Sequence, residues 1–274
     1  MLSFAHIINP ANVSADSDLF VAQPVTFASM RGAAQAAAVG QVTVVQYAVG
    51  FSEDEIPEGF VGLPPLTRSV LNLATFQEPR PLPLLRDILD ALFEASGADY
   101  FIYTNVDIGL QPTFYTQVIE FITGGYDSFV INRRTISGRY GSPDQLPEML
   151  AESGKPHPGW DCFVFPRAIY PRFKLGDVCL GAGRVGMALL ANMVAYSGKF
   201  REFSDMHLTF HIGDDRAWRN PAFADYDSHN TRELTALLAA IEAEVGPFPR
   251  SSIPGRFLWK KRMFGRLYDW WSRR

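Results

Sequence analysis

Cysteine, long apolar runs and an excess of basic residues are scarce or missing in this chain of 274 residues. Its two cysteines, Cys162 and Cys179, are too few for a disulfide framework and stand among apolar neighbours, which indicates a reducing compartment. No apolar stretch is long enough to span a bilayer, and Met1 is not followed by the basic and apolar segments of a secretion signal. From these absences we expect a soluble, cytoplasmic protein.

Acidic residues outnumber basic ones over most of the chain, and the formal net charge is −4. The exception is the segment 255–274, which holds seven Lys or Arg and one Asp. Because the remainder has no basic excess, we expect no nucleic-acid partner. Apolar residues make up 47% of the chain, which suits a globular domain with a sizeable core.

Predicted strands and helices alternate through the first half of the chain and become more mixed in the second half. Runs of β-branched and aromatic residues predict strands, and apolar residues at helical spacing predict helices. The expected strands lie at 6–10, 41–49, from 100, at 128–132, at 161–166 and at 206–212, and the expected helices at 28–38, 83–93, 112–122, 186–196 and 231–245. This order favours an α/β fold with a largely parallel sheet and late β additions.

The strand that begins at Tyr100 ends in Asn105-Val106-Asp107. In open α/β sheets, ligands bind at the carboxyl ends of buried strands of this kind. A carboxylate beside an amide oxygen at such a place suits a hard divalent cation that carries phosphates. The alternative is an ordinary strand-end turn, in which the Asn and Asp side chains hydrogen-bond to local backbone.

Two histidines share one face of the strand predicted at 206–212, because alternation places His207, Thr209 and His211 together. His211 comes just before Gly213 and two acidic residues, so we take it as a candidate metal ligand. Imidazole suits Mn²⁺ better than Mg²⁺. His207 is interpreted as a hydrogen-bonded structural residue.

The segment from His157 to Asp161 (HPGWD) leads into the strand predicted at 161–166. Trp160 offers a flat apolar face for a sugar ring, and Asp161 offers a carboxylate that can act as a general base toward a hydroxyl group. His157 is a further candidate for substrate binding. A turn with a packed tryptophan is the alternative interpretation.

Five arginines flank loops near predicted strand or helix ends: Arg68, Arg80, Arg86, Arg133 and Arg134. Arginine suits bidentate contacts to a diphosphate. Arg68 and Arg80, in the loop before the helix at 83–93, are the candidates for such contacts, and Arg134 is a candidate for substrate binding. We interpret most of the others as surface residues.

With these motifs, the chain resembles glycosyltransferases of the GT-A fold, in the nucleotide-diphospho-sugar transferase superfamily. The resemblance rests on YTNVDI at 103–108, HPGWDCFVF at 157–165 and TFHIG at 209–213, and it covers roughly residues 4–218. It implies a single GT-A type domain over residues 1–250, with a Rossmann-like, mostly parallel sheet flanked by helices.

The resemblance also implies a site and substrates. Asp107, Asn105 and His211 would bind Mn²⁺ or Mg²⁺ on the diphosphate of a nucleotide-sugar donor, with the Asn at 105 shifting ligation onto Asp107. Asn9 and Tyr47 are further candidates for binding the donor. The acceptor would be a glycan or a lipid-linked molecule.

One departure from the family concerns the late helix, where many inverting members carry an acidic residue at the start. This chain has GAGRVG at 181–186 instead, a loop that we do not interpret as a dinucleotide site, because we predict no following strand with an acid about 20 residues on and the preceding segment 178–180 is short. Three alternatives remain: Asp161 is the base, the enzyme retains configuration, or catalysis has been lost. The last would leave a non-catalytic nucleotide-sugar or glycan-binding protein on the same fold. A nucleotidyltransferase is disfavoured, because no Gly-rich phosphate loop follows the first strand.

The segment 251–274 is predicted to be a basic aromatic helix. Phe257, Phe264, Tyr268 and Trp271 recur at helical spacing among basic residues. That pattern is typical of an interfacial helix at an anionic membrane, where a lipid-linked acceptor is found, so we also expect a peripheral position at the inner face of the membrane. The alternative is a helix docked on its own domain or on a partner subunit.

Overall fold

The computed structural model describes residues 2–214 and 221–271, with side chains described up to residue 263. The chain divides into two compact units. Unit 1 comprises Met1–Thr67, Asp87–Pro171 and Ser197–Asp215, and unit 2 comprises Arg68–Arg86, Arg172–Tyr196 and Arg216–Arg274. The domain boundary predicted at residue 250 stays a prediction.

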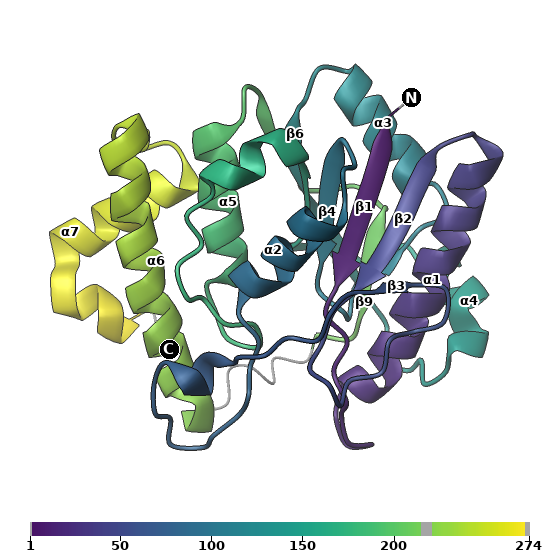
Figure 1. Cartoon of the computed structure of the whole chain (residues 1–274), viewed down its shortest axis with the longest axis horizontal. Coiled ribbons are helices and arrows are strands. Elements are labelled where there is room, and N and C mark those ends of the chain that lie inside the picture. The colour runs from purple at the N-terminus through teal and green to yellow at the C-terminus, as the bar shows by residue number, and fades with distance from the viewer. Residues whose placement is uncertain (1, 215–220, 272–274) are drawn as a thin grey trace. The chain divides into compact units, whose positions relative to one another are not determined.

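Unit 1 contains a sheet of nine strands over the described residues, ordered β3-β2-β1-β4-β7-β6-β9-β5, with β8 also paired to β6 (Figure 1). The strands are β1 (Ser3–Ile8), β2 (Thr43–Ala48), β3 (Val61–Gly62), β4 (Tyr100–Thr104), β5 (Gly109–Leu110), β6 (Ser128–Ile136), β7 (Lys155–Pro166), β8 (Phe200–Phe203) and β9 (Thr209–Ile212). Five of the eight pairings are parallel, and the other three involve β7 or β5. The predicted α/β fold with a mostly parallel sheet flanked by helices is confirmed.

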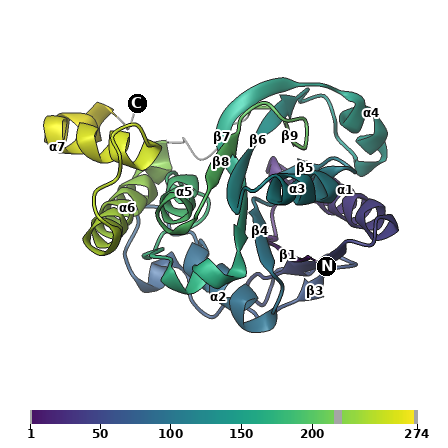
Figure 2. The ribbon, with the colours of Figure 1, turned by 90° about the horizontal axis from the view of Figure 1, so that it is seen from above.

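Helices of unit 1 cover the sheet through a continuous apolar core. They are α1 (Leu19–Val39), α2 (Leu85–Ala95, from Asp87 onward), α3 (Phe114–Thr123) and α4 (Leu146–Ala151). α1 and α3 lie side by side and share one core cluster with β1, β4, β6 and β7 (Figure 2). Met30, Ile102, Phe114 and Val164 are fully buried in this cluster. Their burial holds the carboxyl ends of β1 and β4 in place, where the candidate residues stand.

α1 begins nine residues before the helix predicted at 28–38. Asp18 caps its first turn by accepting a hydrogen bond from the Leu19 N–H at 2.9 Å. Pro24 lies inside the helix and removes one backbone hydrogen bond, upstream of the Ala-rich stretch on which the prediction rested. Val25 and Ser29 in the following turn are buried, so tertiary packing outweighs the local effect of the proline.

β7 is longer than predicted, because it begins at Lys155 and not at Asp161. Pro156 and Pro158 lie in the added part of the strand. The structure accommodates both prolines because β4 pairs with β7 only from Cys162 onward, which leaves one edge of the earlier half free of that strand. The pairing with β6 is also irregular there, with register shifts on either side of Asn132. Of residues 133–159, only 133–136 (β6) and 155–159 (β7) are strand, and the part between them contains α4 and a short 3₁₀ turn at Pro143–Gln145.

Unit 2 contains α5 (Val185–Tyr196), α6 (Ala224–Val245) and α7 (Ile253–Trp271), with 3₁₀ turns at Val70–Asn72 and Pro221–Phe223. Asn230 of α6 is fully buried and ties together the loop that precedes α5. Its Oδ1 accepts from the Cys179 N–H at 2.9 Å, and its Nδ2 donates to the carbonyl oxygens of Cys179 and Gly183 at 2.8 and 2.9 Å. The glycine-rich stretch at 181–186 is thus held by α6.

The first half of α7 packs within unit 2. Phe257 and Leu258 are buried, and Lys261 donates to Thr235 Oγ1 at 2.6 Å. Arg262 forms an ion pair with Glu242 of α6 at 2.5 Å. The aromatic residues predicted to meet a membrane at 264, 268 and 271 lie outside the described side chains.

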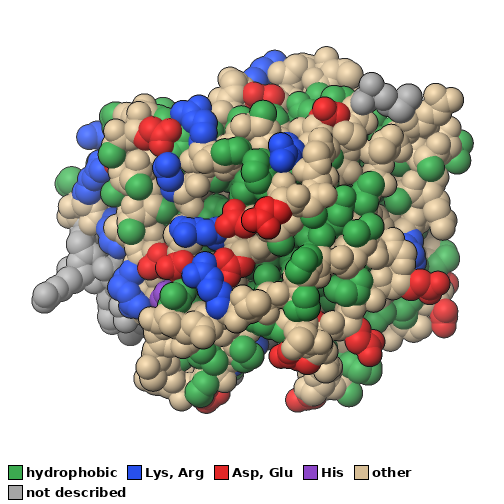
Figure 3. All heavy atoms as spheres, in the orientation of Figure 1, with side chains coloured by type: hydrophobic (Ala, Val, Ile, Leu, Met, Phe, Trp, Pro, Cys, Tyr) green, Lys and Arg blue, Asp and Glu red, His purple; other side chains and the backbone are tan. Residues whose placement is uncertain are grey.

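Surface composition follows the nearly balanced charge of the sequence. On the face shown in Figure 3, basic and acidic side chains are interspersed with apolar ones. Among the described helices, none combines the length and the apolar character needed to cross a membrane.

Candidate functional site

The turn after β4 carries the Asn105-x-Asp107 pair and belongs to unit 1. The Asn105 N–H donates to the carbonyl oxygen of Asp161 at 3.2 Å, and the Ile108 N–H closes the turn on the carbonyl oxygen of Asn105 at 3.2 Å. The turn is therefore joined to β7 at the point where Asp161 stands. This is the strand end at which the sequence placed the site.

Asp107 and His211 are 104 residues apart in sequence and in direct contact. His211 Nε2 lies 3.1 Å from Asp107 Oδ2, and His211 Nδ1 lies 2.9 Å from the carbonyl oxygen of Gly213. A carbonyl oxygen can only accept, so Nδ1 carries a proton and donates it there. Gly213 has φ +70°, a conformation that favours glycine and turns its carbonyl back toward the ring. The histidine is thereby oriented with Nε2 toward Asp107.

A chain of hydrogen bonds runs from Tyr103 through Asn105 to Asp161 and Arg133. The Tyr103 hydroxyl donates to Asn105 Oδ1 at 3.2 Å, and Asn105 Nδ2 donates to Asp161 Oδ1 at 3.0 Å. Asp161 Oδ2 forms an ion pair with Arg133 Nη1. Both side chains of that pair are nearly buried, with 13% of Arg133 and 12% of Asp161 exposed. Both oxygens of Asp161 are therefore engaged.

The electrostatic environment favours the charged forms of Asp107 and His211. Burial works to raise the pKa of Asp107, but the hydrogen bond and charge of His211, with the charge of Arg133, outweigh it and lower that pKa. Burial works to lower the pKa of His211, and the hydrogen bond and charge of Asp107 raise it overall. Burial raises the pKa of Asp161 against the opposing charge of Arg133. These shifts indicate closely spaced, largely desolvated groups.

Trp160 is held by a carboxylate that the sequence did not single out. Its indole Nε1–H donates to Glu202 Oε1 at 2.9 Å, and Asn132 Nδ2 donates to the same oxygen at 3.0 Å. His157 Nδ1 accepts from the Gly159 N–H at 2.9 Å, and its Nε2 lies 3.8 Å from Asp214. The orientation of the indole is thus fixed by its hydrogen bond to Glu202.

The remaining candidates occupy different settings. Asn9 donates to the carbonyl oxygen of Val49 at 2.6 Å and joins the ends of β1 and β2, and Tyr47 is buried in β2 between its register partners in β1 and β3. Arg134 donates to the carbonyl oxygens of residues 153 and 154 and pairs with Asp205. Arg68 and Arg80 belong to unit 2, where the Arg80 guanidinium lies 4.5 Å from the ring centre of Phe223. Their predicted roles stay predictions.

Arg133, Glu202 and Tyr103 are the residues of this region that sequence reasoning missed as site members. Arg133 was grouped with surface arginines, because the strand order that places it against Asp161 is not visible in a single sequence. Glu202 lies in β8, a strand that the sequence pattern did not predict. Residues 200–203 read FREF, and the two charged residues between the phenylalanines leave only a weak strand signal.

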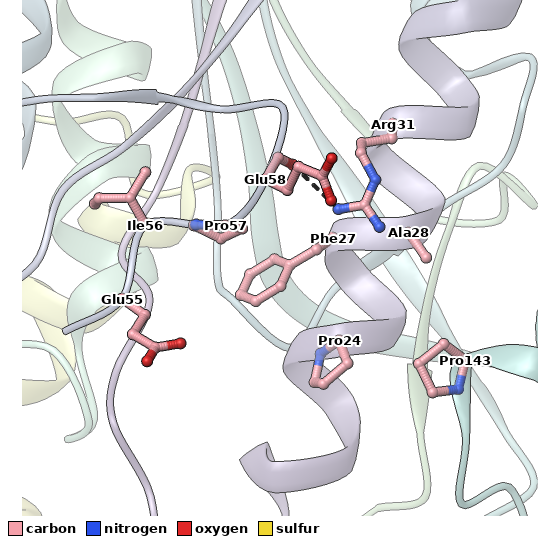
Figure 4. A pocket seen from close by; sticks show the side chains of 9 residues that line it. All are labelled: Pro24, Phe27, Ala28, Arg31, Glu55, Ile56, Pro57, Glu58 and Pro143. Atoms are coloured by element: carbon pink, nitrogen blue, oxygen red, sulfur yellow. Dashed lines mark hydrogen bonds between the residues drawn. The ribbon is translucent and has the colours of Figure 1, made fainter.

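A hollow of about 350 Å³ lies elsewhere in unit 1, between α1 and the loop after β2. Figure 4 shows Arg31 of α1 reaching the carbonyl oxygen of Glu58 across it, at 3.3 Å. Its lining residues are Pro24, Phe27, Ala28, Arg31, Glu55, Ile56, Pro57, Glu58 and Pro143. None of the candidate residues belongs to this set, so the hollow has no part in the chemistry considered below.

Within the part of the chain that the structure describes, no three His, Cys, Asp or Glu side chains gather as a metal-binding group. A cation at this place would depend on Asp107 and His211, with the amide oxygen of Asn105 as a third ligand. Carboxylate, imidazole and amide oxygen together form a donor set that suits Mn²⁺.

The fold and the site define an α/β protein with a cluster of charged residues at the carboxyl end of a central strand. No protein-family model matches the chain, and no curated protein matches its sequence. Solved structures similar to it include S. aureus TarS 1–349 in complex with UDP-GlcNAc, at 8% identity and a TM-score of 0.49, over 97% of this chain and 74% of that one. M. tuberculosis glucosyl-3-phosphoglycerate synthase is similar at 13% identity and a TM-score of 0.48, over 86% of this chain and 80% of that one.

Both matches have TM-scores below 0.5 and identities below 25%. At these values the likeness transfers neither a family, nor a reaction, nor a site residue to this chain. The function must therefore be argued from the residues of this chain.

Proposed function

We propose that the chain is a metal-dependent glycosyltransferase that moves a sugar from a nucleotide-diphosphate donor to a glycan or lipid-linked acceptor. The observation that carries the proposal is the unsatisfied carboxylate of Asp107. Its Oδ1 is buried without a hydrogen-bond partner among the described residues, next to a histidine whose other nitrogen is already committed to a backbone carbonyl. A buried carboxylate oxygen without a donor is costly unless a ligand satisfies it.

A divalent cation fits these residues. Metal-binding histidines usually donate their second ring N–H to a carbonyl or carboxylate, as His211 does to Gly213. His211 Nε2 and Asp107 Oδ2, 3.1 Å apart, would both turn toward the ion. When bound, Mn²⁺ or Mg²⁺ neutralises charge on the diphosphate that leaves the sugar.

Asp161 and Trp160 would serve the acceptor and the sugar. The indole, fixed by Glu202, is a flat surface on which a sugar ring can stack. Asp161 accepts from Asn105 and Arg133, and it could accept the proton of an acceptor hydroxyl once one of these donors leaves. Asn9 and Tyr47, at the ends of β1 and β2, would contact the nucleotide.

The second candidate function is non-catalytic binding of a nucleotide sugar or glycan. It is favoured by one observation: both oxygens of Asp161, the proposed base, are occupied, by Asn105 and by Arg133. A binding protein would keep the donor site and lack turnover.

The deciding experiment combines binding with turnover. Thermal shift with a panel of nucleoside diphosphates, with and without Mn²⁺, is expected to show stabilisation that requires the metal, and release of nucleoside diphosphate from a nucleotide sugar is expected with Mn²⁺ present. Asp107→Asn should abolish both, whereas Asp144→Asn, at an exposed position of unit 1, should leave both unchanged. Binding without turnover on any donor would favour the second candidate, and binding or turnover that ignores the metal would refute the metal-dependent enzyme.

Membrane association through the segment 264–274 is part of the proposal for a lipid-linked acceptor. The basic side chains of Lys261 and Arg262 are bound within unit 2, so the contact would have to come from the residues after them. Salt-dependent binding of the full chain to anionic vesicles, lost when the segment after residue 263 is removed, would support it. Equal binding by the shortened chain would contradict it.

A further inference from the structure

Arg133 lies within the candidate site and uses little of its hydrogen-bonding capacity. Among the described residues its side chain makes one ion pair, from Nη1 to Asp161 Oδ2, and its Nε–H is buried without an acceptor. A guanidinium carries five N–H donors, and leaving a buried donor unsatisfied is unfavourable. Since 13% of the side chain is exposed, a ligand can reach it from solution.

Further unsatisfied polar atoms share the strand face of Arg133. Thr135 of β6 is the register partner of His211 in β9, and Thr209 precedes His211 by two residues. Because alternate residues of a strand share a face, Arg133, Thr135, Thr209 and His211 stand together on these two strands. The hydroxyls of both threonines and Asp107 Oδ1 are buried without partners among the described residues. This face therefore offers two hydroxyl donors that the described protein does not use, and Asp107 Oδ1 is an unused acceptor.

We propose that Arg133 is the anion-binding residue of the site, that it takes a phosphate oxygen of the donor diphosphate, and that it releases Asp161 when it does so. The inference rests on the proposed function and deepens it, since it names the group that recognises the diphosphate and the contact that occupies Asp161 in its absence. Guanidinium pairs well with phosphate, because both present hydrogen-bonding atoms in a matching fork.

Charge balance supports this exchange of partners. Asp161 and Asp107 bring two negative charges to a largely desolvated place, and a diphosphate brings more than one divalent cation can neutralise. Arg133 is the guanidinium within hydrogen-bond distance of this cluster. On turning to the phosphate it frees Asp161 Oδ2, so the acceptor carboxylate becomes available only when the donor is present. Premature proton transfer would thereby be avoided.

The neighbouring Arg134 uses more of its hydrogen-bonding capacity. It donates to the carbonyl oxygens of Ser153 and Gly154, just before β7, and it pairs with Asp205. Arg133 has no comparable set of bonds. With a single ion pair among the described residues, Arg133 has to break only one contact to move from Asp161 to a phosphate.

The test measures binding of inorganic pyrophosphate to the full chain by calorimetry in the presence of Mn²⁺. Arg133→Gln is expected to weaken binding about tenfold to a hundredfold, the worth of one hydrogen bond to a charged group, and Arg133→Lys by less. Arg139→Gln removes the same charge from an arginine whose side chain is 71% exposed, and it should leave the affinity unchanged. Equal affinity of wild type and Arg133→Gln, or no binding by wild type, would overturn the proposal.

Asp161→Asn should change the pyrophosphate affinity in a direction that a purely structural ion pair would not produce. If Arg133 is divided between Asp161 and the anion, removing the carboxylate should tighten pyrophosphate binding. If the pair only joins β6 to β7, the same change should leave binding equal or weaker. Thermal melting of each variant shows that it is folded, so the comparison remains valid if Arg133→Gln is unstable.

Titration with Mn²⁺ alone separates this proposal from the function on which it rests. Arg133→Gln should keep Mn²⁺ binding, and Asp107→Asn should lose it. Absence of Mn²⁺ binding in wild type would refute the metal site and with it the exchange. Normal Mn²⁺ binding with pyrophosphate affinity insensitive to Arg133 would refute the anion site alone.

Discussion

His6 in β1 is buried within the sheet, and its protonation should destabilise the fold at mildly acidic pH. The ring is fully inaccessible, with Nδ1 2.9 Å from the Tyr115 hydroxyl and Nε2 2.9 Å from Thr104 Oγ1. Tyr115 also accepts from Gln46 Nε2 at 3.0 Å. Neutral imidazole fits between one hydroxyl donor and one acceptor, whereas imidazolium needs two acceptors and no carboxylate is among its partners.

The size of the effect follows from linkage. Burial lowers the pKa of His6 from 6.5 to about 3 in the folded chain. A group whose pKa is depressed by folding contributes its full stability above the unfolded pKa, and that stability is lost as the pH falls toward the folded value. At pH 5 the unfolded state has gained most of its proton and the folded state has not, so the free energy of unfolding should fall by about 2 kcal/mol relative to pH 7.5.

The assay is urea denaturation of wild type and of His6→Asn at pH 7.5 and at pH 5. Asparagine can hydrogen-bond to Tyr115 or Thr104 and does not titrate, so the carboxylates and the other histidines contribute equally to both proteins and cancel in the difference. We expect the stability of wild type relative to the variant to decrease by about 2 kcal/mol between the two pH values. The imidazole resonances of His6, followed by NMR, should show no titration between pH 7.5 and pH 5.

A difference that stays constant between pH 7.5 and pH 5 would refute the reasoning, because it would mean that His6 titrates alike in the folded and unfolded states. A change of opposite sign would show that the folded chain stabilises imidazolium, which is incompatible with the contacts to Tyr115 and Thr104.

Two further predictions concern the polar groups that hold each unit together. Asn230→Ala leaves one N–H and two carbonyl groups of the loop before α5 unsatisfied, so it should lower the free energy of unfolding by about 3 kcal/mol in urea denaturation, and a loss below about 1 kcal/mol would show that water replaces the amide. Glu202→Ala frees the Trp160 indole and should cost about 1–2 kcal/mol, whereas Glu202→Gln keeps an acceptor at the same place and should cost less; equal losses would contradict the role of the shared oxygen.

The central part of the fold could be predicted because its strands are local patterns. The run at 100–104 contains aromatic and β-branched residues without a charge, and it becomes a buried strand at the middle of the sheet. His211 stands on a strand with clear alternation, and its place beside Asp107 agrees with the expectation that both belong to one site. Their role as metal ligands stays a prediction.

Other parts could not be predicted, because they depend on which strands are neighbours. Arg133 meets Asp161 since β6 pairs with β7, and a single sequence gives no measure of that pairing. The strand predicted at 161–166 begins earlier, at Lys155, because the edge of a strand tolerates Pro156 and Pro158. The helix predicted at 28–38 also begins earlier, and Pro24 is accommodated within it, with the turn that follows buried.

Asn105 can be tested for its role in the Asn-x-Asp pair. The amide either merely replaces a carboxylate at that position or is a specific hydrogen-bond partner of Asp161. Its Nδ2–H donates to Asp161 Oδ1 at 3.0 Å, which a carboxylate at that place could not do. Asn105→Asp would set two carboxylates against each other in a largely buried setting. We expect it to lower the free energy of unfolding by about 1–3 kcal/mol at neutral pH and not to strengthen metal binding.

The matched control exchanges the two side chains. In the double variant Asn105→Asp with Asp161→Asn, the amide of residue 161 can donate to the carboxylate of residue 105, so part of the lost stability should return relative to Asn105→Asp alone. Additive losses in the double variant would show that the hydrogen bond is not what selects asparagine. Restored stability would mean that the asparagine at 105 exists because a carboxylate already stands at 161, so that the site is built around one metal-facing acid, Asp107, and one acid, Asp161, kept apart from it by an amide.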